Sequence, residues 1–409
     1  MTDTPSGGVA EEVTARAPLS GVRVLDLSRV LAGPYCSALL ADLGAEIIKI
    51  EMPGRGDDTR EIGPFRGSES IYFQILNRRK KSVTLNFKDP DGTRLLLELA
   101  AHCDVILENF RPGVTEHLGI DYATVVRANP KIVYASISGY GQSGPMASYP
   151  AYDIIVQAAS GLMSITGFPD GPPTKVGESI GDLTAGVFAA FAISTALYDA
   201  ARTGQGAHLD VSMLECLLSL EVTAESVYNA TGTAPGRVGN RHPVSTPFGA
   251  YEAMDGFVIL AAANDELFAR VARLIDKPDM VGDPRYATDE LRTEHEPEVR
   301  AAIEAWTKQR SVADVVRSAQ DAGVPTSAIS DLAQALASEQ LAARGALSHF
   351  THRVAGNVQY VGQPVRFSSQ VPTAPVAGPT LGADTDAVLG ELLGTSAEEL
   401  SALHARGAL

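Results

Sequence analysis

Asp182 is the residue of this sequence best placed to carry out chemistry. It ends a loop that contains Gly177 and Gly181, and a run of Ala, Val, Phe, Ile and Leu follows directly. A helix that is apolar on all sides is typical of a buried core, so Asp182 is expected where a buried helix begins. Two interpretations stay open. Its carboxylate caps the first N–H groups of the helix, or it is a nucleophile that the helix N-terminus keeps ionised.

Two other stretches could hold a phosphorylated ligand. Residues 78–81 are four consecutive cations, which indicate either a solvated surface or an anion site. Residues 139–144 match G-x-G-x-x-G after a predicted strand, but Pro145 follows where the helix of a dinucleotide site should begin. The turn at residues 28–34, after the first predicted strand, lacks this motif. A dinucleotide cofactor is therefore disfavoured.

The composition argues against several classes of partner. A formal charge of −16 argues against nucleic acid and anionic membranes, because binding to phosphates needs a basic surface. The predicted helix over residues 184–197 is too short, and too rich in Ala, Gly and Thr, to span a bilayer. Cys36, Cys103 and Cys216 form no C-x-x-C and suggest neither a disulfide framework nor a metal site. Free thiols of this kind predict a cytoplasmic protein.

Strands and helices alternate up to about residue 140, which predicts an α/β fold with a doubly wound, Rossmann-like large domain. A hairpin around Asp255 and a mostly helical stretch after it predict a second, smaller α+β domain. The predicted organisation is a disordered tail over 1–17, a large domain over 18–229, a linker or lid over 230–249, a small domain over 250–335 and a return segment over 336–409. The tail is polar and acidic and does not resemble a signal peptide.

The sequence resembles the class III CoA-transferases, which include formyl-CoA, carnitine and succinyl-CoA:dicarboxylate CoA-transferases. Collinear blocks carry the resemblance from Leu19 to beyond Gly206: LSGVRVLDLSRVLAGPYCSALLADLGAEIIKIE, PGRGDDTR, NRRKKSVTLN, VILENFRPGV, ISGYGQSGP, YDIIVQAASGLM and GDLTAG. It implies an interlocked homodimer that uses acyl-CoA and a small carboxylic acid as substrates and holds no permanent cofactor. It also implies that Asp182 attacks the thioester, passing through an aspartyl anhydride and an aspartyl-CoA thioester.

A CoA site is implied by the same resemblance. Its residues would be Val30, Ala32, Leu85, Lys88, Asn109, Phe110, Arg111, His117 and Tyr140. Lys88 would contact a phosphate or the adenine side, and Phe110 would make an apolar contact.

The sequence departs from the family pattern at three positions of this implied site. Met52 and His117 stand where formyl-CoA transferase or many other members have arginine, and Ser138 stands where formyl-CoA transferase has lysine. The contacts to the CoA phosphates are therefore expected to move, to Arg111 or to residues 78–81.

The acceptor is expected to be a dicarboxylic acid, with succinyl-CoA as the donor. The counterpart of the family's lid, residues 236–246, lacks the tetraglycine of formyl-CoA transferase and carries Arg237, Arg241 and His242. These three are the predicted substrate-binding residues, because arginine can hold a second carboxylate bidentately. The alternative is that they are solvated loop cations.

Two other functions remain as alternatives. The family includes α-methylacyl-CoA racemase, which pairs the aspartate with a histidine just before the position of Asp153. Tyr152 stands there, and a tyrosine of pKa near ~10 is a poor base at neutral pH, which favours the transferase. A non-catalytic acyl-CoA binding protein is disfavoured because it has no need of a desolvated acid at residue 182.

Overall fold

The computed structural model describes residues 17–368 and 373–409. They form two compact units. The first comprises residues 17–160, Gly177–Glu221 and Ala342–Leu409, and the second comprises Gly161–Val176 and Val222–Leu341. The second unit thus begins before the predicted boundary at residue 229 and also takes in the short segment that precedes the Asp182 loop. Of the predicted tail, only Ala17 lies within the described residues.

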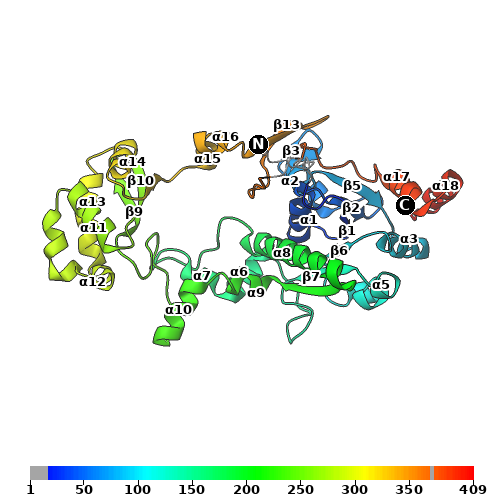
Figure 1. The fold of residues 1–409 in the computed structure, drawn as a ribbon, viewed down its shortest axis with the longest axis horizontal. Coiled ribbons are helices and arrows are strands. Elements are labelled where there is room, and N and C mark those ends of the chain that lie inside the picture. The colour runs from blue at the N-terminus through cyan, green and yellow to red at the C-terminus, as the bar shows by residue number, and fades with distance from the viewer. Residues whose placement is uncertain (1–16, 369–372) are drawn as a thin grey trace, which may run out of the picture. The chain divides into compact units, whose positions relative to one another are not determined.

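A six-stranded parallel sheet is the centre of the first unit (Figure 1). In spatial order its strands are β5 (Lys80–Thr84), β2 (Glu46–Glu51), β1 (Arg23–Asp26), β6 (Val105–Glu108), β7 (Val133–Ser138) and β8 (Ala207–Ser212). Every neighbouring pair is parallel, and Leu25 lies opposite Ile48 on β2 and Ile106 on β6. The prediction of an α/β fold built on a parallel sheet is confirmed.

Helices cover both faces of this sheet because alternate strand residues point to opposite sides. On one face, Leu25, Ile48 and Ile106 share a core with helices α3 (Pro90–Ala100), α5 (Tyr122–Ala128), α17 (Thr385–Leu393) and α18 (Ala397–Arg406). On the other face lie α1 (Ala32–Asp42), against β1, β2 and β6, and α8 (Ile180–Thr203), against β7 and β8. The two C-terminal helices thus complete the core of the first unit.

The other elements of the first unit are short. They are η1 (Asp58–Glu61), β3 (Phe65–Arg66), β4 (Glu69–Ser70), α2 (Ile71–Leu76), α4 (Val114–Leu118), α6 (Asp153–Ser160), α9 (Met213–Leu218), β12 (Leu347–His352) and β13 (Gly356–Val361). A further helix, α16 (Glu339–Ala343), spans the boundary between the units. Within the predicted return segment, residues 362–372 have the composition of a possible strand. This stretch forms no strand in its described part, and the rest of it lies outside the described residues.

The second unit packs helices around a small antiparallel sheet of order β11-β10-β9. Its elements are α7 (Leu162–Ile165), α10 (Val222–Thr231), β9 (Phe248–Ala253), β10 (Gly256–Ala261), α11 (Asp265–Leu274), η2 (Pro278–Gly282), η3 (Pro284–Tyr286), α12 (Asp289–Glu294), α13 (Glu296–Thr307), α14 (Val312–Asp321), β11 (Thr326–Ala328) and α15 (Leu332–Leu336). Strands β9 and β10 form the predicted hairpin around Asp255. The core of the second unit includes Tyr251, Phe268 and Trp306.

Helix α8 differs from the prediction in length and in burial. It has 24 residues instead of the expected span over 184–197, and its length and composition alone would suit a membrane span. One face packs so closely on α1 that a Cβ on Gly186 would lie 2.7 Å from the carbonyl oxygen of Ala32. Phe188 and Phe191 are exposed on the described chain. The prediction that this helix is buried on all sides is therefore wrong for the single chain.

Candidate active site

Asp182 does not cap the helix that it begins. It is the third residue of α8, and Ser179 at the N-cap provides no side-chain hydrogen bond. Instead, Asp153 of α6 accepts a hydrogen bond from the N–H of Gly181, with an N–O distance of 2.7 Å. The capping interpretation of Asp182 is therefore wrong. A different acid takes this role and leaves the carboxylate of Asp182 available for chemistry.

The environment of Asp182 favours its protonated form. Burial, and after it the negative charge of Asp153, raise the pKa of Asp182 to about 7. Desolvation penalises the charged carboxylate and so acts against the stabilisation expected from the helix N-terminus. The sequence suggested an acid that the helix keeps ionised. In the structure the acid titrates close to neutrality, and its ionised form is a stronger base than an ordinary aspartate.

Tyr72 of α2 is a further group near Asp182, and sequence reasoning missed it. Burial, followed by the charge of Asp182, raises the pKa of Tyr72 to about 12. Tyr72 is thus a neutral phenol with an O–H to donate. Such a donor can stabilise an oxyanion if it lies near the reacting carbonyl. No sequence signal marks Tyr72, because it stands inside an ordinary helical segment.

The residues implied for CoA binding follow the carboxyl ends of four parallel strands, which share one edge of the sheet. Val30 and Ala32 follow β1, Leu85 and Lys88 follow β5, Asn109, Phe110 and Arg111 follow β6, and Tyr140 follows β7. His117 lies in α4, the next helix after β6. The chain leaves β1 towards β2 and β5 but leaves β6 towards β7 and β8. Ligands of open α/β sheets bind at such a reversal of strand order.

Asn109 ties the loops after β1 and β6 together. Its Oδ1 accepts from the N–H of Arg29 at 2.9 Å, and its Nδ2 donates to the carbonyl oxygen of Arg29 at 2.8 Å. Beside this bridge, Val30 has a φ of +68°, a conformation that is rare for a β-branched residue. Asn109 thus positions the turn at the reversal of strand order.

The implied CoA residues differ in what they present to a ligand. Lys88, Arg111 and His117 are exposed, so their side chains are available to phosphates. The side chain of Leu85 is fully buried in the core of the sheet. Leu85 can therefore contact a ligand only through its backbone.

The four cations at residues 78–81 are all engaged by groups of the protein, and Arg78 and Lys80 are buried, which corrects the interpretation of the run as a free anion site or a fully solvated surface. Arg78 pairs with Asp42 at 2.6 Å, and Lys80 pairs with Asp26 at 3.1 Å, both with buried side chains. The other two cations are also engaged. Lys81 pairs with Glu46, and Arg79 donates to the carbonyl oxygens of Ala41 and Ala374. The run is part of strand β5 and its approach, which places its charges against acids of α1, β1 and β2.

The sequence also gave no indication of a buried charge network formed by β2 and the loop that follows it. Lys49 pairs with Asp57 at 2.8 Å, and both side chains are almost completely buried. Glu51 pairs with Arg60 at 2.7 Å. The network anchors the loop that follows β2. Fully buried ion pairs are not expected from a sequence, because isolated charges normally stay in water.

The three residues predicted to bind the acceptor have different partners within the second unit. The guanidinium of Arg237 donates to the carbonyl oxygens of Phe168 and Gly171 at 3.2 and 2.7 Å. The guanidinium of Arg241 contacts the carbonyl oxygen of His242 at 3.5 Å, and His242 stacks on Phe248. Among the described residues, Arg241 has no carboxylate partner. Arg241 is therefore better able than Arg237 to accept a carboxylate ligand.

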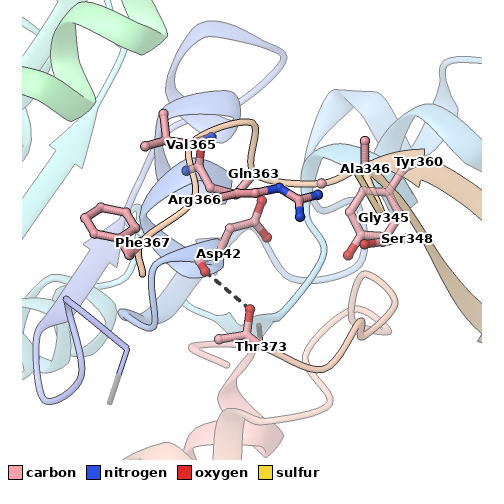
Figure 2. A pocket seen from close by; sticks show the side chains of 11 residues that line it. Asp42, Gly345, Ala346, Ser348, Tyr360, Gln363, Val365, Arg366, Phe367 and Thr373 are labelled. Atoms are coloured by element: carbon pink, nitrogen blue, oxygen red, sulfur yellow. Dashed lines mark hydrogen bonds between the residues drawn. The ribbon is translucent and has the colours of Figure 1, made fainter. Parts of the chain in front are cut away.

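A separate pocket of about 240 Å³ lies between the end of α1 and the β12–β13 hairpin (Figure 2). Arg366 and Asp42 both line it, and Thr373 donates to the carbonyl oxygen of Asp42 at 3.3 Å. None of the site residues predicted from the sequence lines this pocket.

Over the described part of the chain, no group of three or more His, Cys, Asp or Glu side chains could hold a metal ion.

Comparison with known proteins gives one consistent result. The family model described as CoA-transferase family III matches residues 19–385. The chain is 44% identical to an acetyl-CoA:oxalate CoA-transferase of Acetobacter aceti, covering 86% of this chain and 90% of that protein. It is 37% identical to a succinyl-CoA:glutarate CoA-transferase of Mus musculus, covering 95% and 89%. A crystal structure of a CAIB/BAIF family protein from Brucella suis superposes with a TM-score of 0.81 at 34% identity, covering 92% of this chain and all of that one. With its parallel sheet and its aspartate at the start of α8, the chain belongs to CoA-transferase family III.

Proposed function

We propose that this protein transfers CoA from an acyl-CoA, succinyl-CoA by preference, to a small dicarboxylic acid, with Asp182 as the nucleophile. One observation carries the proposal: within the described residues, Asp182 is a largely desolvated carboxylate at the start of α8 that serves neither as cap nor as ion-pair partner. The names of several relatives support the acceptor class, since they are CoA-transferases for oxalate, glutarate and D-citramalate.

The first half of the reaction moves CoA onto the protein. A carboxylate oxygen of Asp182 attacks the thioester carbonyl of the donor, a C–O bond forms, the C–S bond breaks, and CoA leaves as a thiolate. The product is a mixed anhydride between Asp182 and the donor acyl group. The thiolate then attacks the Asp182 carbonyl of this anhydride, which releases the donor as a free carboxylate and leaves an aspartyl-CoA thioester.

The second half repeats these steps in reverse. The carboxylate of the acceptor attacks the aspartyl-CoA thioester, the thiolate leaves again, and a second anhydride forms. The thiolate attacks the acyl carbonyl of the acceptor, which gives the new acyl-CoA and restores the Asp182 carboxylate. Each step exchanges one acyl–heteroatom bond for another, so no oxidant, metal or net proton transfer is needed.

The surrounding residues support this chemistry in three ways. The partial burial of Asp182 limits the access of water, which would otherwise hydrolyse the anhydride. The N–H of Gly181 is engaged by Asp153. The other N–H groups at the start of α8, together with the neutral phenol of Tyr72, are donors of the kind that stabilise a tetrahedral oxyanion. Lys88, Arg111 and His117 are exposed cations or potential cations that we propose for the phosphates of CoA.

The test is to trap the aspartyl thioester. Incubation with succinyl-CoA followed by hydroxylamine should convert Asp182 to its hydroxamate, which peptide mass spectrometry detects as a mass shift confined to the Asp182 peptide. Omission of succinyl-CoA is the control. Absence of the hydroxamate under conditions that support CoA exchange would remove Asp182 from the mechanism. The same incubation in deuterium oxide with a 2-methylacyl-CoA tests the racemase alternative, because α-deuterium without CoA transfer would favour that reaction.

We also propose that the protein is a cytoplasmic homodimer. Exposed apolar side chains gather on or directly beside α6, α8 and α9, which contact one another: Tyr152, Ile154, Ile155, Val187, Phe188, Phe191, Tyr198, Leu218 and Leu220. Soluble monomers rarely expose a contiguous patch of this extent. The cysteines at positions 36, 103 and 216 are free and buried, which fits a reducing compartment.

Light scattering is expected to give twice the mass of one chain. Phe191→Glu would place a charge in the apolar patch and should shift the protein towards monomer, with the dissociation constant raised at least about tenfold, because an unpaired buried charge is costly. Phe257→Glu on β10, which removes another exposed phenylalanine, is the matched control and should leave the mass unchanged. A wild-type protein that is monomeric at micromolar concentration would contradict the proposal.

A further inference from the structure

We infer that Asp153 is a positioning residue for Asp182: it fixes the first turn of α8 and holds a second negative charge against the Asp182 carboxylate. The inference rests on the proposed role of Asp182 as nucleophile. Asp153 lies at the start of α6 and is buried.

Asp153 and Gln157, which lies one helical turn later on α6, form hydrogen bonds that fix the chain just before Asp182. Oδ1 of Asp153 accepts from the N–H of Gly181 at 2.7 Å, and Oδ2 accepts from Nε2 of Gln157 at 2.7 Å. Nε2 of Gln157 also donates to the carbonyl oxygen of Glu178 at 3.3 Å. The residue directly before Asp182 and the residue four positions before it are thus both fixed to α6.

The close approach of α6 explains why glycine precedes Asp182. A Cβ on Gly181 would lie 2.9 Å from Cγ2 of Val156 and 3.1 Å from Oδ1 of Asp153. Both distances are shorter than ordinary carbon contacts, so a larger side chain would push α6 away. Gly181 therefore permits the hydrogen bond that holds Asp153 beside the nucleophile.

Asp153 is also the charged group that acts on Asp182. After burial, its charge is the effect that raises the pKa of Asp182. Within the described residues, the other titratable groups on Asp182's own loop and on the elements near α8 add nothing to this rise: Glu178, Tyr35, Cys36, Tyr72, His208, Asp210, Glu215 and Cys216.

This arrangement favours acylation of Asp182. The ionised carboxylate is repelled by Asp153, whereas the anhydride and the thioester formed on Asp182 carry no charge at that atom. The repulsion is therefore relieved as the first C–O bond forms, which is a gain made in the transition state and not in the free enzyme. A buried Asp153 contributes to rate in this way without touching the substrate.

The experiment compares wild type with Asp153→Asn, which keeps an oxygen to accept from Gly181 but removes the charge. Carbodiimide modifies protonated carboxyl groups, so the pH dependence of labelling at Asp182, measured by peptide mass spectrometry, reports its titration without turnover. In Asp153→Asn the labelling midpoint should fall by about one pH unit or more. At pH 8, where Asp182 is mostly ionised in both proteins, kcat/KM should fall about tenfold while the KM for acyl-CoA changes little.

Glu178→Gln is the matched control, because it removes another acid close to Asp182 in the chain and should leave the labelling midpoint unchanged. Asp153→Ser, which keeps an oxygen near Gly181, serves the same test if the asparagine variant does not fold. An unchanged midpoint in a folded Asp153 variant overturns the inference. If the midpoint falls but Asp182→Ala retains activity, the electrostatic coupling stands and the proposed nucleophile does not.

Discussion

Replacement of Asp182 by alanine or asparagine is expected to give a folded protein without CoA-transferase activity. Neither side chain can form an anhydride with the acyl group, so both halves of the exchange lose their first step. A loss of at least about 10³-fold in kcat is expected, the scale on which removal of a covalent nucleophile acts. The measurement is the rate of CoA exchange between succinyl-CoA and glutarate, followed by chromatographic separation of the two thioesters.

Stability measurements distinguish loss of chemistry from loss of fold. The pKa of Asp182 is raised from 3.8 to about 7 in the folded protein. A raised carboxyl pKa gives stability that is fully present below the unfolded value and is lost as the pH rises through the folded value. At pH 8 the wild type therefore carries a partly buried, ionised acid that Asp182→Asn lacks. The variant should melt at an equal or higher temperature at pH 8, and this difference should shrink towards pH 4.

The outcome is decisive only with suitable controls. Glu178→Gln should retain activity, because its side chain is exposed and has no role in the proposed chemistry. Mass spectrometry must exclude deamidation of the asparagine in the Asp182→Asn variant, which would restore the aspartate. Turnover by Asp182→Ala comparable with that of wild type would exclude the covalent mechanism, whatever the fold.

The sheet of the first unit could be predicted from the sequence because its strands are continuous apolar segments. Segments such as residues 45–51 and 131–138 are typical of parallel strands that are buried on both faces. Strand β5 at residues 80–84 does not begin with such a segment. Its first residues are Lys80 and Lys81, and the charge of Lys80 is buried only because Asp26 on β1 lies within 3.1 Å. Such pairing across strands depends on the tertiary structure and leaves no local signal.

The sequence likewise predicted only part of the candidate site. The glycine loop and the apolar run identify Asp182, since both features are adjacent to it in the chain. The groups that determine its chemistry come from other segments: Asp153 is 29 residues earlier in the sequence, and Tyr72 is earlier still. A pattern in one sequence shows neighbours along the chain. Only the fold shows that Asp153 of α6 accepts from the first turn of α8. Capping of the helix therefore does not explain why residue 182 is an acid.

We expect a small dicarboxylic acid, such as glutarate or succinate, to be a better acceptor than a monocarboxylic acid of equal length. One carboxylate of the acceptor reacts at Asp182 and cannot stay paired. The second would be unpaired in a largely dry site, which is unfavourable unless a cation holds it. We propose that Arg241 is this cation, because its guanidinium has no carboxylate partner among the described residues, whereas that of Arg237 is engaged by backbone carbonyls.

The expected preference follows from the strength of one charge-assisted contact. A hydrogen-bonded arginine–carboxylate pair contributes on the order of 1.5–3 kcal/mol, which corresponds to roughly a tenfold to hundredfold preference in kcat/KM. The measurement compares glutarate and succinate with valerate and butyrate in wild type and in Arg241→Ala. The variant should lose most of the preference by using diacids less well, while its rate with monoacids changes little.

Arg273→Ala is the matched control for this loss of charge, because Arg273 is an exposed arginine of the same unit. It should retain the wild-type preference for diacids. Equal use of monoacids and diacids by wild type would reject the second-carboxylate argument itself. A preference that survives in Arg241→Ala would reject only the role of Arg241, since the chemistry at Asp182 requires just one carboxylate from the acceptor.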